Sequence, residues 1–339
     1  MCRRTSPART SGEYILICGQ RISQWFSHRR YLIYIIVLVG LSINWAGICY
    51  LHFKSSPGPL NTEAFLSFAE GSDKYGDFDG VWRLRIFSNY FASFFVTKNS
   101  PIESLAKGVG QWSAFWFALC GLVYMLWEKR FWLVMIFGTF GALCYGFMPP
   151  SGYRLYPWDM PAMFFYCLLF LICRYRWPLP ALSIVILGSG FKETIAICSV
   201  VFLFWESLSI GKRISLLMAA IGGCILLRVL IDVFIVGGTV HTFLGLVDRM
   251  PLELFDNMRR FLSKTWFHPL LINSGTLLIF FLLPTKDRDD LMWKTVTLIF
   301  LAIVMIGGIV TEYRIFWELI PLSMARIAKE WSAQPPHFL

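Results

Sequence analysis

The chain has 339 residues, of which 56% are hydrophobic and 15% are charged, and its mean hydropathy is +0.58. Most of such a chain is expected to lie in lipid. The net charge of +10 does not require a nucleic-acid partner, because basic loops that face anionic lipid account for it.

Apolar runs predict an all-α polytopic membrane bundle of about ten transmembrane helices. A transmembrane helix needs ~20 mostly apolar residues, or fewer where the flanking side chains snorkel. The fourth, fifth and tenth runs are short, so nine or eleven spans are also compatible with the pattern. The predicted spans are 31–50, 109–127, 131–148, 160–173, 177–190, 194–208, 214–236, 266–283, 291–310 and 315–327.

Basic residues predict the orientation of these spans. The segment 1–30 carries six arginines before the first span, and Glu13 is its only acid, so the positive-inside rule places it in the cytoplasm. Alternation then places the transmembrane domain at 31–327 and a cytoplasmic tail at 328–339. Each short loop expected on the cytoplasmic side has its own basic pair: Lys129/Arg130, Arg174/Arg176, Lys212/Arg213 and Lys286/Arg288.

Two long segments, 53–108 and 237–265, are predicted to lie on the opposite, extracytoplasmic side. Within the first, the aromatic run 86–96 is too short to span and is expected to form a helix in the outer interface. The sequence Ser100-Pro101-Ile102-Glu103 is a capping box, which predicts a helix that continues into the second span. The second segment is expected to contain one amphipathic helix.

The remaining charges gather on this outer side and predict a site there, because ionisable groups near a bilayer are costly. In the first outer loop, Asp77 and Asp79 are candidate general bases, and Arg83 and Arg85 are candidates for gripping phosphate oxygens. Asp in a glycine-rich turn also commonly caps backbone amides, so a purely structural role stays open. Further candidates for binding an anionic substrate are Arg154, Asp159, Glu312 and Arg314.

The pair Lys192-Glu193 is the sharpest local signal, because it separates two apolar runs at a short outer turn. Lys192 is a candidate for phosphate, and Glu193 is a candidate for orienting it, contacting sugar hydroxyls or acting as the base. The alternative is a charged pair that only marks the interface. Asp159 can likewise be a helix N-cap, while Arg154, Glu312 and Arg314 can be interface anchors. Arg228 and Asp232 are spaced for an intrahelical salt bridge and are left out of the predicted site.

These residues together resemble the GT-C superfamily of polytopic membrane glycosyltransferases, and in particular its bacterial members. The resemblance rests on the basic N-terminus and the long acidic first outer loop. It also rests on three short motifs: Tyr156-Pro157-Trp158-Asp159, Gly190-Phe191-Lys192-Glu193-Thr194 and Glu312-Tyr313-Arg314. Two features depart from the family pattern: the first-loop acids are separated by one residue, and a lysine replaces the arginine of the turn.

The resemblance implies transfer of a sugar from a polyprenyl-phosphate carrier to a glycan or lipid acceptor, in assembly of the cell envelope at the bacterial inner membrane. A carboxylate would take the proton of the acceptor hydroxyl, and cations would hold the leaving phosphate. No cofactor is required; a divalent cation at Asp77 and Asp79 is compatible with the reading but not needed.

Three other classes remain open. A transporter or flippase of lipid-linked or anionic substrates would also cluster charges, but is expected to place some of them at mid-membrane on broken helices. A polysaccharide polymerase or an acyltransferase would also use charges on the outer face, and an acyltransferase usually needs a histidine base, for which His241 is the candidate. A non-catalytic membrane subunit is the third.

Overall fold

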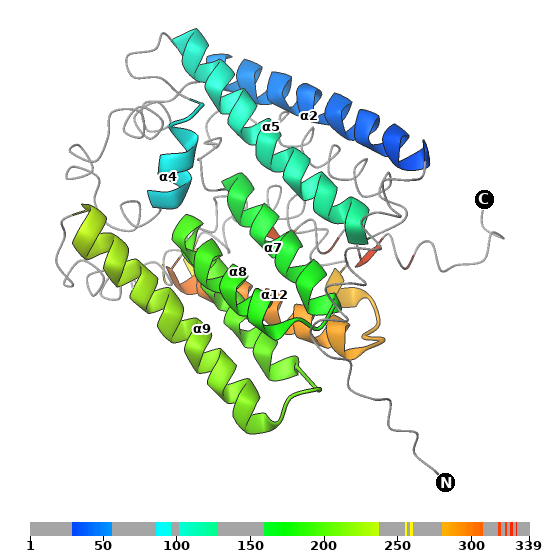
Figure 1. Cartoon of the computed structure of the whole chain (residues 1–339), viewed down its shortest axis with the longest axis vertical. Coiled ribbons are helices and arrows are strands. Elements are labelled where there is room, and N and C mark those ends of the chain that lie inside the picture. Colours follow the sequence, from blue (N-terminus) through cyan, green and yellow to red (C-terminus); the bar gives the residue numbers. More distant parts are fainter. Residues whose placement is uncertain are drawn as a thin grey trace.

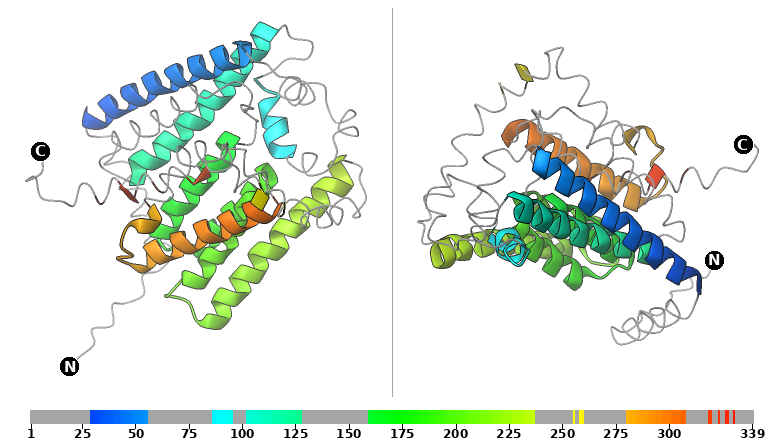
Figure 2. Two further views of the ribbon diagram at one scale, coloured as in Figure 1. Left: turned by 180° about the vertical axis from the view of Figure 1, so that it is seen from behind. Right: turned by 90° about the horizontal axis from the view of Figure 1, so that it is seen from above.

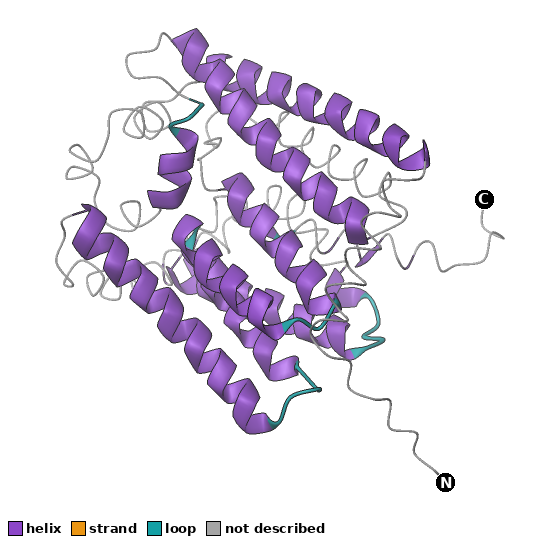
Figure 3. Cartoon of the chain, in the orientation of Figure 1, coloured by secondary structure: helices purple, strands orange, loops and turns teal. Residues whose placement is uncertain are grey.

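The computed structural model describes residues 29–55, 86–95, 102–127, 159–236 and 280–307, together with residues 255, 258, 259, 318, 319, 323, 326, 327 and 330. Over these residues the structure contains helices, turns and bends but no strand (Figure 3). The predicted all-α class is confirmed to this extent. The span at 131–148, most of the span at 266–283 and most of the loops 53–108 and 237–265 lie outside the described residues.

Helices α2 (Arg29–Ser55) and α5 (Ile102–Trp127) form an antiparallel pair along one edge of the molecule (Figure 1). Lys54 Nζ lies 3.9 Å from Glu103 Oε1, which joins the end of α2 to the beginning of α5. α5 begins at Ile102, so the capping box correctly predicted a helix that runs into the second span. Both helices are longer than the apolar cores predicted at 31–50 and 109–127.

Glycines let these two helices approach closely. A Cβ built on Gly110 would lie 2.6 Å from the carbonyl oxygen of Ala46, and one on Gly121 would lie 2.2 Å from a methyl of Leu38. Gly110 and Gly121 are about three helical turns apart, so they face α2 along one line. Small residues on such a line are what allows close contact between helices in lipid.

The middle of the chain turns back and forth through four segments: α7 (Asp159–Arg174), α8 (Pro178–Phe191), η4 (Glu193–Phe204) and α9 (Ile210–Leu230), which is followed by the π-helical turn η5 (Ile231–Val236). Cys224 lies against the carbonyl of Val185 and Arg228 against that of Ser189, so α9 runs parallel to α8. The spans predicted at 160–173, 177–190 and 214–236 coincide with α7, α8 and α9–η5 to within a few residues.

The span predicted at 194–208 is a 3-10 helix rather than an α-helix. A 3-10 helix rises about 2.0 Å per residue against about 1.5 Å for an α-helix. The 12 residues of η4 therefore reach about 24 Å, although the segment is short for a transmembrane α-helix. This extra reach lets η4 pair with α8 and α9 along much of their lengths.

Helix α12 (Arg288–Gly307) crosses behind this layer, as the view from behind shows (Figure 2). Trp293 lies 5.1 Å from Phe170 between ring centroids, and Phe300 lies 6.2 Å from Tyr166. Because the later residue of α12 meets the earlier residue of α7, the two helices run antiparallel. α7 and η4 thus begin at the end of the molecule where α8, α9 and α12 finish.

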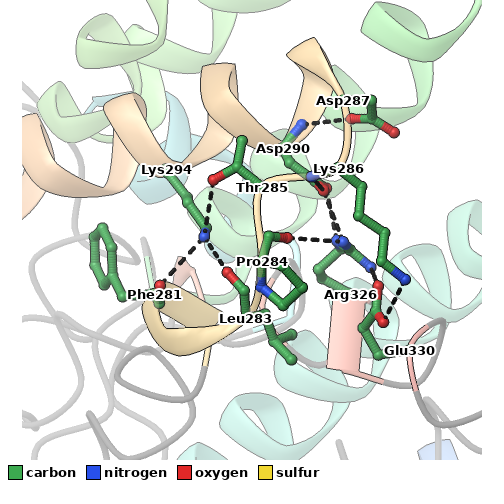
Figure 4. Close-up of polar contacts among 10 residues, drawn as sticks. All are labelled: Phe281, Leu283, Pro284, Thr285, Lys286, Asp287, Asp290, Lys294, Arg326 and Glu330. Atoms are coloured by element: carbon green, nitrogen blue, oxygen red, sulfur yellow. Dashed lines mark hydrogen bonds and ion pairs between the residues drawn. The ribbon is translucent and has the colours of Figure 1, made fainter.

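A polar network holds the beginning of α12 to the C-terminal segment (Figure 4). Arg326 donates to both carboxylate oxygens of Asp290, at 2.6 and 2.7 Å, and also pairs with Glu330. Lys286 Nζ donates to Glu330 at 2.7 Å. Lys294 donates to the carbonyls of Phe281 and Leu283, which satisfies backbone groups where the preceding helix ends.

Three of the four loops predicted to carry cytoplasmic basic pairs meet at this same end, and the fourth, with Lys129 and Arg130, lies outside the described residues. Arg176, which follows α7, lies 3.1 Å from Asp289. Arg288 pairs with Glu206, the residue that begins the η4–α9 loop. Arg213 donates to the Leu208 carbonyl at 2.9 Å. Arg176 has a φ of 59° in a Schellman-type helix end, a left-handed position that glycine normally takes.

Within the described residues, α9 is the one helix that is both long and apolar enough to cross a membrane, judged by length and composition. Residues 35–51 of α2, together with α8 and η4, are apolar but shorter. The outer face of α9 exposes a row of large apolar side chains: Ile210, Ile214, Met218, Ile221, Ile225, Leu226 and Leu230.

Replacing Gly110 with alanine should destabilise the α2–α5 pair, because the new Cβ would overlap a backbone oxygen that cannot rotate away. We expect a loss of about 1–3 kcal/mol in the free energy of unfolding, measured by thermal or denaturant unfolding in detergent. Gly47→Ala is the matched control in α2, since nothing lies within 4 Å of its built Cβ. It should be neutral or stabilise by up to about 1 kcal/mol, and equal losses in both variants would contradict the packing.

Candidate functional site

The candidate site is built around the turn between α8 and η4, where one extended residue reverses the chain. Lys192 has φ −154° and ψ 133°, and its backbone N–H donates to the Gly188 carbonyl at 3.0 Å. Gly188 makes the tight turn possible, because a Cβ there would lie 2.9 Å from Ile195 and 3.0 Å from Phe165. The turn sends consecutive side chains to different surroundings: Lys192 is buried, whereas the Glu193 side chain is 38% exposed.

Lys192 lies between two buried carboxylates from distant parts of the chain. Its Nζ is 3.0 Å from Oδ1 of Asp159, the first residue of α7, and it also pairs closely with Oε1 of Glu318. All three side chains are at most 4% exposed. Buried charges need partners of this kind, because an isolated ion in a poorly hydrated interior costs several kcal/mol. One lysine thus faces two acids, and we call this set the Lys192 triad.

Hydrogen bonds extend the Lys192 triad to the next residues. The Thr194 hydroxyl donates to Glu318 Oε2 at 2.5 Å. The Tyr166 hydroxyl, from the second turn of α7, donates to the Thr194 carbonyl at 2.8 Å. Glu318 therefore contacts the residues on both sides of Glu193, while α7 holds the same turn through Asp159 and Tyr166.

Glu193 faces a different cation. Arg228, near the end of α9, lies 3.6 Å from Glu193 Oε2 and donates to the Ser189 carbonyl in the last turn of α8. The Arg228 side chain is 6% exposed. We predicted that Arg228 pairs with Asp232 and left both out of the site. The structure places Arg228 against Glu193, which brings Arg228 into the site. The side chain of Asp232 lies outside the described residues, so its pair with Arg228 stays a prediction.

Aromatic rings surround the residue before Lys192. Phe191 contacts Phe91 with stacked rings at 5.7 Å and Phe165 at 4.9 Å. Phe91 belongs to α4 (Ile86–Ala92), the short helix predicted at 86–96, which is fastened to the turn by a hydrogen bond from Ser88 to the Phe191 carbonyl. On the outer side of α4, Tyr90 and Phe94 are 61% and 68% exposed. An apolar aromatic surface thus adjoins the candidate site.

The arrangement limits what each group can do chemically. Lys192 is buried between two carboxylates, which suits a structural role. Contact of Lys192 with phosphate stays a prediction. Glu193 lies against a second cation, Arg228. Its half-exposed carboxylate is the group of this cluster best placed to meet a substrate hydroxyl.

The structure therefore brings together three of the predicted site residues, Asp159, Lys192 and Glu193. The others lie outside the described residues: Asp77, Asp79, Arg83, Arg85, Arg154, Glu312 and Arg314. Sequence reasoning missed Glu318, Arg228, Thr194 and Tyr166. Glu318 and Arg228 carried a usable signal, because each is an ionisable residue inside an apolar run.

Across the described part of the chain, no group of three or more His, Cys, Asp or Glu residues is arranged to hold a metal ion. Asp77 and Asp79, the residues predicted to be able to bind a divalent cation, lie outside the described residues. The cysteines at 49, 120, 198 and 224 are buried and form no disulfide there, consistent with small packing residues.

The sequence and the structure were compared with those of known proteins. No protein-family model matches the chain, and no curated protein and no solved structure is significantly similar to it.

Replacing Lys192 with methionine should strongly destabilise the protein, because it leaves Asp159 and Glu318 buried without their shared cation. We expect a loss of about 3–5 kcal/mol, or failure to accumulate in folded form. Lys54→Met is the matched control, since Lys54 pairs with Glu103 with half of its side chain exposed. An exposed pair of this kind contributes about 0–1 kcal/mol. Similar unfolding midpoints for the two variants would show that the triad does not support the fold.

Proposed function

We propose that the chain is a polytopic membrane glycosyltransferase that moves a sugar from a polyprenyl-phosphate donor to an extracytoplasmic acceptor. One observation carries the proposal. Asp159, Lys192 and Glu193 meet at one end of the helices, and the three basic loops that the structure describes meet at the opposite end. A one-sided polar site beside an apolar aromatic surface suits a substrate that has a charged head and a lipid tail.

Embedding in a membrane is supported by the surface of α9, which displays apolar side chains along its whole length. The directions of α7, α8, η4, α9 and α12 are those expected of the fourth to seventh and ninth spans of a ten-span chain. With the basic loops in the cytoplasm, the Lys192 triad and Glu193 would face outward. This orientation places the N-terminus in the cytoplasm, and the resemblance to GT-C enzymes places the chain in a bacterial inner membrane.

We assign the general base to Glu193, with Asp79 and Asp77 as the alternative. The acceptor hydroxyl oxygen attacks the anomeric carbon while the bond between that carbon and the phosphate oxygen breaks. The hydroxyl proton passes to the carboxylate, and polyprenyl phosphate leaves with its negative charge. Arg83, Arg85, Arg154 and Arg314 are the proposed contacts for that phosphate, because arginine binds phosphate oxygens in a bidentate fashion. Asp159 and Lys192 shape the turn rather than touch the donor, and Glu312 stays a candidate for the acceptor.

A transporter or flippase of lipid-linked substrates is the second candidate, and one observation favours it. Lys192, Glu318 and Arg228 are buried charges gathered at the α8–η4 turn, and buried charges of this kind also line the substrate paths of transporters. A non-catalytic membrane subunit would need neither the half-exposed carboxylate nor a donor site.

The orientation can be tested with single cysteines and a membrane-impermeant maleimide. Cysteine at position 193 or 79 should react from outside intact cells or right-side-out vesicles. Cysteine at position 130 or 212 should react only after the membrane is opened, because those positions lie in the proposed cytoplasmic loops. Reaction of positions 193 and 212 from the same side would contradict the opposite ends seen in the structure.

The chemistry can be tested by transfer from a polyprenyl-phosphate sugar in proteoliposomes. Glu193→Gln keeps the shape and removes the base, so it should lower transfer by ~10²–10⁴-fold while donor binding persists. Glu103→Gln is the matched control, because Glu103 is exposed at the same end and its partners among the described residues, Tyr50, Lys54 and Lys107, lie at the α2–α5 junction.

Full activity of Glu193→Gln with loss of activity in Asp79→Asn or Asp77→Asn would move the base to the first outer loop. A wild-type protein that binds no sugar donor would refute the glycosyltransferase proposal. Movement of a lipid-linked substrate across the bilayer without transfer would establish the second candidate instead.

A further inference from the structure

Glu318 contacts both neighbours of Glu193 in the sequence. Its Oε1 pairs with Lys192, and its Oε2 accepts the hydroxyl of Thr194 at 2.5 Å. Glu318 itself is 1% exposed. It comes from the C-terminal part of the chain, 124 residues beyond Thr194. The two carboxylate oxygens therefore connect a distant segment to two points of one turn.

This double contact constrains the residue between the two points. Lys192 is held on its other side by Asp159, and the Thr194 carbonyl is held by Tyr166. With both flanking residues fixed, the backbone at Glu193 has little freedom to rotate. Its side chain lies beside Arg228 and is partly exposed.

We propose that Glu318 is a positioning residue, which clamps the α8–η4 turn so that the Glu193 carboxylate is presented to the acceptor. The inference rests on the proposed function, in which Glu193 is the base. The clamp acts through the turn and does not touch the substrate. A catalytic group held in this way needs no reorganisation when the substrate arrives, and a displacement of about 1 Å can cost ~10²-fold in rate.

Two variants each weaken one of the two contacts that Glu318 makes with the turn. Glu318→Gln preserves the shape but removes the charge that Lys192 meets. Thr194→Val preserves the volume but removes the hydroxyl. Thr194→Ser keeps the hydroxyl and is the conservative rescue.

Arg326→Gln is the matched control for damage to the fold. Arg326 lies in the same C-terminal segment and is similarly buried, but its partners Asp290 and Glu330 are at the opposite end. Breaking a buried ion pair lowers stability at either end.

Transfer rate per folded protein is the first measurement. We expect Thr194→Val and Glu318→Gln to lower kcat by ~10–10²-fold with little change in the KM for the donor, because the donor site is intact. Thr194→Ser and Arg326→Gln should stay close to the wild-type kcat, even where Arg326→Gln melts at lower temperature. Equal kcat for Thr194→Val and Thr194→Ser would overturn the proposal, as would a kcat loss in Arg326→Gln as large as that in Glu318→Gln.

A second measurement does not depend on catalysis. With cysteine at position 193, the rate of maleimide reaction reports how firmly the turn holds that side chain. Adding Thr194→Val or Glu318→Gln should change the rate by ~10-fold, the effect of about 1.4 kcal/mol in local opening. Adding Arg326→Gln should leave it unchanged.

Together, the two measurements test the positioning role of Glu318 separately from the proposed glycosyl transfer. Altered reaction rates in a protein that transfers no sugar would establish the clamp and refute the glycosyltransferase proposal. Unaltered reaction rates would overturn the clamp, whatever the protein catalyses.

Discussion

The pairing of Lys192 with two buried carboxylates is the constraint around which the rest of the described structure is arranged. Asp159 begins α7, Lys192 separates α8 from η4, and Glu318 belongs to the C-terminal segment, so one ammonium group joins three parts of the chain. Burial makes the arrangement obligatory, because none of these charges can be left without a partner in a poorly hydrated interior. The carboxylates also fix which way the turn points, and this direction leaves Glu193 half exposed.

Close packing of the helices holds the buried charged side chains near one another. Glycines let neighbouring segments approach closely: a Cβ on Gly110 would overlap the backbone of Ala46, and one on Gly188 would overlap the side chain of Ile195. The long 3-10 segment η4 fits the same packing, since its greater rise per residue lets twelve residues reach as far as the helices beside it.

The two ends of the molecule use charge differently. At the end with the basic loops, Arg326 and Asp290 form a bidentate pair and Arg288 reaches Glu206, so neighbouring loops are joined by pairs of opposite charge. At the other end the Lys192 triad brings two acids to one lysine, and Glu193 lies beside both Arg228 and an aromatic surface. Among the residues that the structure describes, the second end combines a partly exposed carboxylate with exposed aromatic side chains, which is why the proposed chemistry is placed there.

Several elements could be predicted because their determinants are local. The apolar runs indicated α7, α8 and α9 to within a few residues, since helix formation needs only contiguous apolar length and suitable ends. The capping box placed the beginning of α5, because its hydrogen bonds connect residues three apart. The prominence of Lys192-Glu193 was visible for the same reason: a charged pair between two apolar runs is unusual wherever the chain goes.

The sequence by itself therefore determined the all-α class, most of the described helix boundaries and the importance of one turn. Only the tertiary structure decided which charges pair. Glu318 lies 124 residues from Thr194 along the chain, and Arg228 meets a carboxylate that belongs to another helix, 35 positions before it. Pairing between distant residues depends on how helices pack and how the backbone repeat changes at their ends. Which distant residues pair is therefore decided by many contacts together and cannot be predicted from the spacing of two residues in the sequence.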